Sequence, residues 1–376
     1  MVERVAQREA RKKTKTSFID CDIHNIVPSV DVLEPYLPAR WRKHVETFGM
    51  RQHHGFASGI PYPKASPGGG SRVDAWPPSG LPPGADLDFM REQHLDVQNI
   101  EYGILNCLYP KVGELLNEEL GAALARATND WQIAAWLEKE PRLRASIVVP
   151  YENAEFSAAE IDRVADHPGF VQVVLLPRTK EPLGKRRYWK IYEAAERHGL
   201  PIGIHFAGLG GNPITSSGWP SFYIEDHTVM AQAFQSQVIS LVYEGIFERF
   251  PDLRVVLMEG GFAWLPSLMW RLDKHWKRLR EEVPFLKRPP SEYIRKHMWA
   301  TTQPMEEPTN PKHLLQVIEH LGSDDMLMFS TDYPHWDYDN PDRAFPVRLP
   351  DALKRKIFSE NARALYRFEG ETRVSG

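Results

Sequence analysis

The hydrophobic and polar positions of this chain repeat a two-part pattern from residue 17 onward. Short runs rich in Val, Ile and other apolar residues alternate with longer stretches whose apolar residues are spaced three and four apart. The short runs are typical of buried strands, and the longer stretches of amphipathic helices. We predict eight strands, at 18–23, 102–107, 145–149, 171–176, 201–204, 254–258, 297–300 and 326–330. Helices are predicted at 129–140, 188–198, 235–249, 264–280 and 311–321, and Gly199 allows the left-handed turn that ends the second of these.

Eight strands that alternate with helices predict an α/β fold, a (β/α)8 TIM barrel with long loops at its C-terminal face. No glycine-rich phosphate loop follows the first strand, which disfavours an open nucleotide-binding sheet. We expect a single barrel domain at 17–370, preceded by a basic flexible tail at 1–16. Loop insertions are expected at about 40–88 and 207–226, where they cover substrate or form a dimer, unless they are plain surface loops.

Composition narrows the choice of partners. The chain has 376 residues, of which 42% are hydrophobic, and a formal net charge of −4, so it lacks the basic excess that nucleic-acid binding needs. No apolar run approaches the roughly 18 residues of a membrane span, and the polar start lacks the apolar core of a secretory signal. Cys21 and Cys107 lie in apolar runs and are expected to be buried thiols. We expect a cytoplasmic protein that binds a small-molecule substrate, interacts with neither nucleic acid nor membrane, and forms a homodimer.

Ionisable residues stand at the carboxyl ends of several predicted strands, where the active sites of such barrels lie. Asp22 and His24 end the first strand, two residues apart and therefore on one face. His205 ends the fifth, Glu259 follows the sixth and Asp332 the eighth. Two imidazoles and two carboxylates suit a borderline divalent cation with one position left open. We therefore predict a metal site built from Asp22, His24, His205 and Asp332. Each residue alone is as often structural as functional.

These motifs resemble the amidohydrolase superfamily, and within it the amidohydrolase-2 branch, which includes aminocarboxymuconate semialdehyde decarboxylase and hydroxybenzoate decarboxylases. The resemblance covers about residues 18–368 and rests on the first-strand Asp-Ile-His, the fifth-strand His, Glu-Gly-Gly-Phe-Ala-Trp-Leu-Pro at 259–266 and Ser-Thr-Asp-Tyr-Pro-His-Trp at 330–336. It implies that Asp22, His24 and His205 are metal ligands, and that Asp332 is both a ligand and the base that handles the proton of metal-bound water.

Three departures from the common family pattern refine this expectation. The first ligand is Asp22 instead of His, as in the decarboxylase subset. The fourth strand ends at Leu-Leu-Pro-Arg without the lysine that bridges two metals in many relatives, which favours one ion. That ion is expected to be Zn²⁺, with Mn²⁺, Fe²⁺ and Co²⁺ as alternatives. The sixth-strand position, often histidine in decarboxylases, is Glu259.

Three functions remain open. The first is a metal-dependent hydrolase of a small, aromatic or cyclic amide, ester or lactone, with metal-activated water and Asp332 as general base. The alternative is a non-oxidative decarboxylase of an aromatic or muconate-like acid, in which Glu259 serves as the acid only if burial raises its pKa. The second alternative is a metal-bound binding module without catalysis.

Further residues are candidates for the site on weaker grounds. His227 and His335 are expected to orient substrate or assist catalysis, although loop or cap histidines are a comparable explanation. Arg178 is a candidate for pairing with a substrate carboxylate, with a surface salt bridge as the alternative. Trp219 and Trp336 are expected to form apolar walls of the substrate pocket. The adjacent His53 and His54 lie in the first long loop and are more simply solvated.

Overall fold

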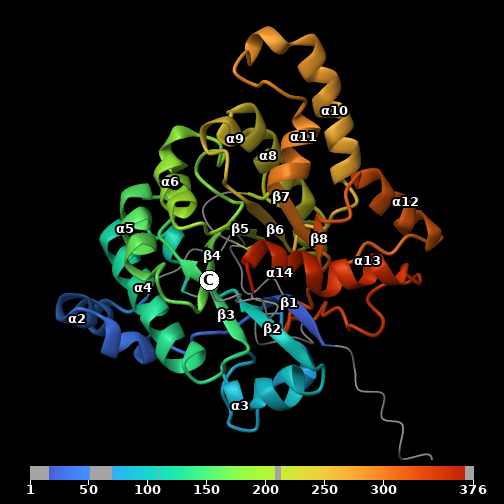
Figure 1. The fold of residues 1–376 in the computed structure, drawn as a ribbon. Helices are drawn as coiled ribbons and strands as arrows, with labels where there is room; N and C mark the ends of the chain where they lie inside the picture. The colour runs from blue at the N-terminus through green and yellow to red at the C-terminus, as the bar shows by residue number, and fades with distance from the viewer. Residues whose placement is uncertain (1–16, 51–69, 109, 208–212, 369–376) are drawn as a thin grey trace, which may run out of the picture.

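The computed structural model describes residues 17–50, 70–108, 110–207 and 213–368. Their eight strands are parallel and pair in sequence order, which makes a nearly closed (β/α)8 barrel with helices around it (Figure 1). The strands are β1 (Phe18–Ile23), β2 (Ile100–Leu105), β3 (Leu143–Val148), β4 (Phe170–Leu175), β5 (Ile202–His205), β6 (Val255–Met258), β7 (Met298–Thr301) and β8 (Leu327–Met328). The predicted fold class is confirmed.

Backbone hydrogen bonds join the first strand to the segment at the end of the eighth. The Cys21 amide donates to the Phe329 carbonyl at 3.0 Å, and the Asp332 amide donates to the Asp22 carbonyl at 3.1 Å. The second bond ties together two of the predicted metal ligands. Closure of the barrel therefore also brings the first-strand and eighth-strand ends of the site together.

The helices of the described residues surround the strands (Figure 1). They are α2 (Ala39–Phe48), α3 (Leu87–Met90), α4 (Glu118–Gln132), α5 (Ala154–Val164), α6 (Trp189–Arg197), α7 (Tyr223–Thr228), α8 (Met230–Tyr243), α9 (Ile246–Arg249), α10 (Leu265–Arg278), α11 (Pro290–His297), α12 (Lys312–Leu321), α13 (Asp351–Arg355) and α14 (Asn361–Tyr366). Within the ranges the structure describes, none of them has the length and apolar character needed to cross a membrane.

Local sequence explains where several helices begin and end. The Asn117 side chain accepts the Leu120 amide at 3.1 Å and caps the start of α4, which begins earlier than the helix predicted at 129–140. Gly199 has a φ of 65°, the left-handed conformation predicted for it. The helix predicted at 235–249 is instead two helices, because Gly245 has a φ of 75° between α8 and α9.

The described parts of the expected insertions include helices. Residues 39–48, at the start of the first insertion, form α2 instead of an irregular loop. Residues 51–69, including His53 and His54, lie outside the described residues, as does the predicted basic tail at 1–16. The second insertion ends in α7, whose side chains approach the metal-site residues.

An ionic cluster around the buried Glu140 offers a test of the packing. Glu140, whose side chain is only 6% exposed, accepts hydrogen bonds from Arg142 Nε and Arg91 Nε, both at 2.8 Å. The bonds from Arg142, together with those from Arg91, lower the pKa of Glu140 to about 2. A carboxyl group whose pKa is depressed in the folded state contributes stability above its unfolded pKa of roughly 4.3, and loses that contribution as the pH falls toward the folded value.

We expect Glu140→Gln to lower the free energy of unfolding by about 2 kcal/mol at pH 7, because each arginine loses its charged acceptor. The deficit should shrink between pH 4.3 and pH 2, as the wild-type carboxylate becomes protonated. Urea unfolding at pH 7 and at pH 3 measures both values. Glu155→Gln, at a side chain 69% exposed, is the control and should change little. An equal deficit at both pH values would contradict the role assigned to this ion pair.

Candidate metal centre

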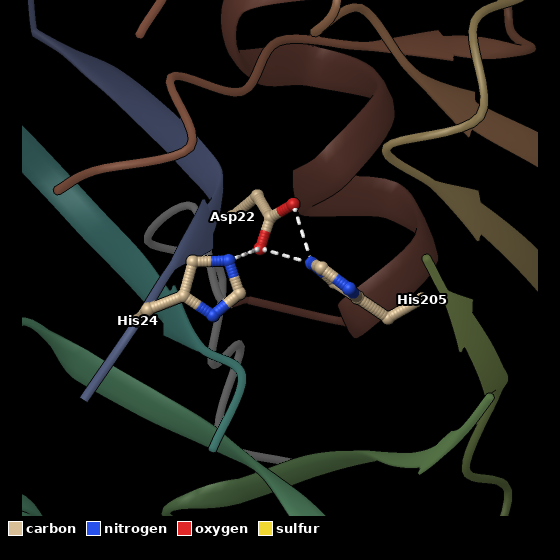
Figure 2. Close-up of side chains that lie close together, drawn as sticks. All are labelled: Asp22, His24 and His205. Carbon is tan, nitrogen blue, oxygen red and sulfur yellow. Dashed lines mark hydrogen bonds and ion pairs between the residues drawn. The ribbon is translucent and has the colours of Figure 1, made fainter. Parts of the chain in front are cut away.

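Asp22, His24 and His205 converge at the carboxyl ends of β1 and β5. Figure 2 shows both imidazole rings directed at the carboxylate of Asp22. His205 Nε2 lies 3.0 Å from Asp22 Oδ2 and 3.1 Å from Oδ1, and His24 Nε2 lies 3.4 Å from Oδ1. One potential ligand atom from each residue lies within 4.8 Å of the others. All three residues are buried.

The backbone fixes which nitrogen of each imidazole faces the cluster. His24 Nδ1 donates to the Asn106 carbonyl at 2.8 Å, and His205 Nδ1 donates to the Phe206 carbonyl at 2.6 Å. A neutral imidazole that donates through Nδ1 presents the lone pair of Nε2, which is how metal-bound histidines are usually oriented. Both Nε2 atoms therefore face carboxylate oxygens, an arrangement that a cation stabilises and that is repulsive without one.

Asp332, in the segment that follows β8 and lies next to β1, completes the group. Its Oδ1 lies 2.9 Å from His24 Nε2 and accepts a 2.7 Å hydrogen bond from His335 Nδ1. Burial alone would raise the pKa of Asp332, but the charge of the neighbouring His335 and its hydrogen bond outweigh that effect and lower the pKa. The same ion pair raises the pKa of His335, against the effect of its burial. Asp332 also has a φ of 61°, a strained value for aspartate of the kind that clusters at functional sites.

Glu259 borders the same cluster. Its Oε2 lies 3.6 Å from His205 Nδ1, and carboxylate oxygens of Glu259, Asp332 and Asp337 lie within 4.8 Å of one another. Burial, followed by the charges of Asp332, Asp337 and Asp22, raises the pKa of Glu259 well above its ordinary value. Glu259 also has a positive φ, of 57°. This direction of the pKa shift is the one that an acid role of Glu259 requires.

Helix α7 and the chain after β8 form an aromatic edge next to these acids. His227 Nε2 lies 3.2 Å from Asp337 Oδ2, and the His227 ring lies 5.3 Å from that of Trp336. Trp336 Nε1 donates to the Tyr223 hydroxyl at 3.0 Å. The structure thus places the candidates His227 and Trp336 beside the metal-site residues. Trp219 is 45% exposed in the segment before α7, and its role as a pocket wall stays a prediction.

Two imidazoles, two carboxylates and a bordering third carboxyl fit a single divalent cation, since Zn²⁺, Mn²⁺, Fe²⁺ and Co²⁺ all accept nitrogen and oxygen ligands. The four predicted ligands lie together, and the orientation of the two Nε2 atoms is the feature that a metal best explains. The geometry does not choose among these ions.

Comparison with known proteins agrees with this geometry. The amidohydrolase family model matches residues 19–368, nearly the whole chain. The chain belongs to the amidohydrolase-2 family. This confirms the resemblance inferred from the strand-end motifs.

Several curated relatives of this amidohydrolase-2 protein are decarboxylases. It is 26% identical over 314 residues to the gamma-resorcylate decarboxylase of Polaromonas sp., covering 77% of this chain and 93% of the relative. It is 25% identical over 302 residues to that of Rhodococcus jostii, covering 76% and 88%. A solved dihydroxybenzoic acid decarboxylase from Polaromonas sp., with bound manganese and the inhibitor 2-nitroresorcinol, superposes with a TM-score of 0.65 at 21% identity, covering 94% and 97%.

Several residues around the site were not predicted from the sequence. Asp337 was missed although it lies five residues after Asp332 in the same loop. Gln303, which follows β7, donates through Nε2 to Asp332 Oδ2 at 3.2 Å and to Asp337 Oδ2 at 3.0 Å. Asn106 donates to Asp22 Oδ1 at 2.8 Å. The polar residues after β2 and β7 were the available signal, but amides at strand ends are common and point to no particular chemistry.

Asp20 was also missed, and it supports two ligand-bearing segments at once. Its Oδ1 accepts the amides of Thr331 at 2.9 Å and Asp22 at 3.2 Å, and its Oδ2 accepts the Thr331 hydroxyl at 2.6 Å. His94 Nε2 lies 2.9 Å from Oδ2, and its ring stacks on Tyr333 at 4.4 Å. Asp20 therefore fixes the backbone next to Asp22 and Asp332 without reaching the metal position itself.

We expect Asp20→Asn to weaken metal binding by about 10- to 100-fold, the usual cost of losing a residue that orients metal ligands. The amide keeps the size of the side chain but replaces one acceptor oxygen with a donor, which opposes the Thr331 or Asp22 amide. Competition with a chelator measures the Mn²⁺ dissociation constant, and thermal unfolding verifies the fold. Asp96→Asn, at a side chain 61% exposed, is the matched control. Unchanged Mn²⁺ affinity in Asp20→Asn would show that Asp20 does not position the ligands.

Proposed function

We propose that this protein is a metal-dependent, non-oxidative decarboxylase of an aromatic acid. The observation that carries the choice of reaction is the alignment with two gamma-resorcylate decarboxylases along 93% and 88% of their lengths. This favours the decarboxylase alternative over the hydrolase that the sequence analysis put first. The site geometry is compatible with both reactions, because each needs a metal position and a nearby acid.

Asp22, His24, His205 and Asp332 would hold the cation. When bound there, the cation would supply positive charge to the carboxylate and to the phenolic oxygen of the substrate. The bound manganese of the solved Polaromonas structure makes Mn²⁺ a candidate beside the expected Zn²⁺. A non-catalytic binding module is disfavoured, because Glu259 lies beside the ligands as an acid that metal storage does not require.

Decarboxylation needs a proton at the ring carbon that loses the carboxylate. The bond between that carbon and the carboxylate breaks, its electron pair stays on the ring carbon, and a proton takes the place of the departing carbon dioxide. Glu259 is the donor we assign, because three carboxyl groups this close cannot all be ionised at low cost and one is expected to keep its proton. Solvent then returns the proton to Glu259.

The remaining residues position these groups. His335 and Gln303 donate to Asp332 and hold its two oxygens in place. His227 orients Asp337 on the far side of the cluster. Trp336 is assigned as an apolar wall against which an aromatic ring stacks.

A substrate panel tests this proposal. The Mn²⁺-loaded and Zn²⁺-loaded protein is incubated with hydroxybenzoates, and in parallel with aryl amides, esters and lactones. We expect carbon dioxide release from at least one hydroxybenzoate, loss of that activity in chelator and its recovery on adding metal. Hydrolysis of an amide, ester or lactone without carbon dioxide release from any acid would restore the hydrolase interpretation.

A further inference from the structure

Arg178 is a buried cation beside the metal centre whose hydrogen-bonding capacity is only partly used. Its side chain is 1% exposed, and Nη2 makes a 2.6 Å ion pair with Asp226 Oδ1. Among the residues that the structure describes, neither Nε nor Nη1 has a hydrogen-bond acceptor. A buried guanidinium normally satisfies its donors, and the two unpaired donors of Arg178 could be satisfied by an acceptor on a bound molecule.

The position of Arg178 ties it to the substrate end of the barrel. It follows β4 by three residues, and Leu175 at the end of β4 pairs with Ile204, the neighbour of His205. Its guanidinium carbon lies 5.5 Å from the ring centre of Phe206, whose carbonyl accepts the hydrogen bond from His205. Asp226, its partner, precedes His227, which pairs with Asp337 at the metal centre. Arg178 is therefore buried beside the segment that carries the predicted metal ligand His205, and is not itself one of the predicted metal ligands.

A second cation, Lys111, lies in the segment after β2 and is partly buried. Burial lowers the pKa of Lys111, the carboxylate of Glu114 opposes that change, and the positive charge of Arg178 adds to it. Lys111 is therefore a second positive charge that Arg178 influences, and the acidic groups that act on the two cations are Glu114 and Asp226. A carboxylate is the acceptor that suits a guanidinium with unused donors next to an ammonium.

We propose that Arg178, assisted by Lys111, binds a second carboxylate of the substrate, so that the natural substrate is an aromatic dicarboxylic acid that keeps one carboxylate in the product. This inference rests on the proposed decarboxylase function for the first carboxylate. A purely structural alternative is that the Arg178–Asp226 pair only holds α7 against the barrel.

Equilibrium binding of inert acids tests the inference separately from turnover. We would measure the dissociation constants of benzoate, isophthalate and terephthalate on the Mn²⁺-loaded protein by calorimetry. At least one dicarboxylate should bind about 10- to 100-fold more tightly than benzoate, the range expected for hydrogen bonds to a charged group. Because none of these acids carries the ring hydroxyl of the hydroxybenzoates, this preference can be measured even if no carbon dioxide release is found.

Variants distinguish recognition from mere support of α7. Arg178→Met should abolish the dicarboxylate preference while benzoate affinity stays within about threefold, and Lys111→Met should reduce it partly. Asp226→Asn removes the ion pair but keeps the guanidinium, so it should retain the preference. If Arg178→Met fails to fold because Asp226 is left unpaired, Arg178→Met combined with Asp226→Asn removes both buried charges and takes its place. Arg348→Met, at a side chain 90% exposed, is the control.

Two results would overturn the inference. One is a dicarboxylate affinity no greater than that of benzoate in the wild type. The other is loss of the preference in Asp226→Asn to the same extent as in Arg178→Met, which would assign Arg178 to the support of α7 alone. A third outcome separates the two proposals. If no carbon dioxide is released but dicarboxylates still bind more tightly than benzoate in an Arg178-dependent way, the proposed reaction is overturned and the carboxylate site stays in place.

Discussion

Asp332→Asn is expected to lower the rate of carbon dioxide release by at least about a thousandfold and to weaken metal binding. Asp332 contacts His24 and His335 through one oxygen and Gln303 through the other, so its charge holds together three residues around the metal position. An amide of the same size removes that charge and replaces one of the two carboxylate oxygens, which can accept from His335 or bind metal, with a donor. Metal content by mass spectrometry and turnover by carbon dioxide detection measure the two effects.

Asp351→Asn provides the matched control, because the Asp351 side chain is 81% exposed and far along the chain from the strand ends. It should retain full metal content and activity. A folded Asp332→Asn protein that keeps one equivalent of metal and wild-type turnover would show that the ligand assignment is wrong.

Glu259→Gln is expected to reduce turnover by about 10²- to 10⁴-fold while metal content stays near the wild-type value. Glutamine keeps the shape of the side chain but has no acidic proton to deliver to the ring carbon. Glu259 also lies next to Nδ1 of His205 and not next to Nε2, the predicted metal-binding atom. Its substitution should therefore leave metal binding by His205 intact. Steady-state rates and metal analysis on the same preparation separate these effects.

Glu155→Gln, at an exposed glutamate, controls for the substitution itself and should leave both values unchanged. Loss of metal together with activity in Glu259→Gln would instead make Glu259 a ligand. Wild-type turnover in the variant would assign the proton to another group, and His335 would be the next residue to test.

The barrel could be predicted from the sequence because each strand is a short apolar run between amphipathic helices. The predicted first strand, 18–23, matches β1 in both bounds. The predicted eighth strand, 326–330, is longer than β8, because the chain after Met328 turns to make the side-chain contacts of Ser330 and Asp332 and no longer pairs along β7. The start of α4 was missed because its first turn is acidic and polar, and its cap is the single residue Asn117.

The predicted site residues that the structure brings together are those of a type that is costly to bury. Asp22, His24, His205 and Asp332 stand out at strand ends because buried charges need partners or a metal. Asp20 and His94 escaped notice because their contacts join residues more than 70 positions apart, which no local pattern reveals. The same holds for the ion pair between Arg178 and Asp226, which lie 48 positions apart in the sequence.

Reaction in heavy water tests the proposed function most directly. The Mn²⁺-loaded enzyme is supplied with a hydroxybenzoate labelled with ¹³C in its carboxyl group, and the products are analysed by mass spectrometry and NMR. We predict ¹³C-labelled carbon dioxide and a phenol that carries one deuterium at the carbon that lost the carboxylate, with both signals abolished in Asp332→Asn. Recovery of every hydroxybenzoate with its label intact, together with turnover of an ester, amide or lactone, would contradict decarboxylation.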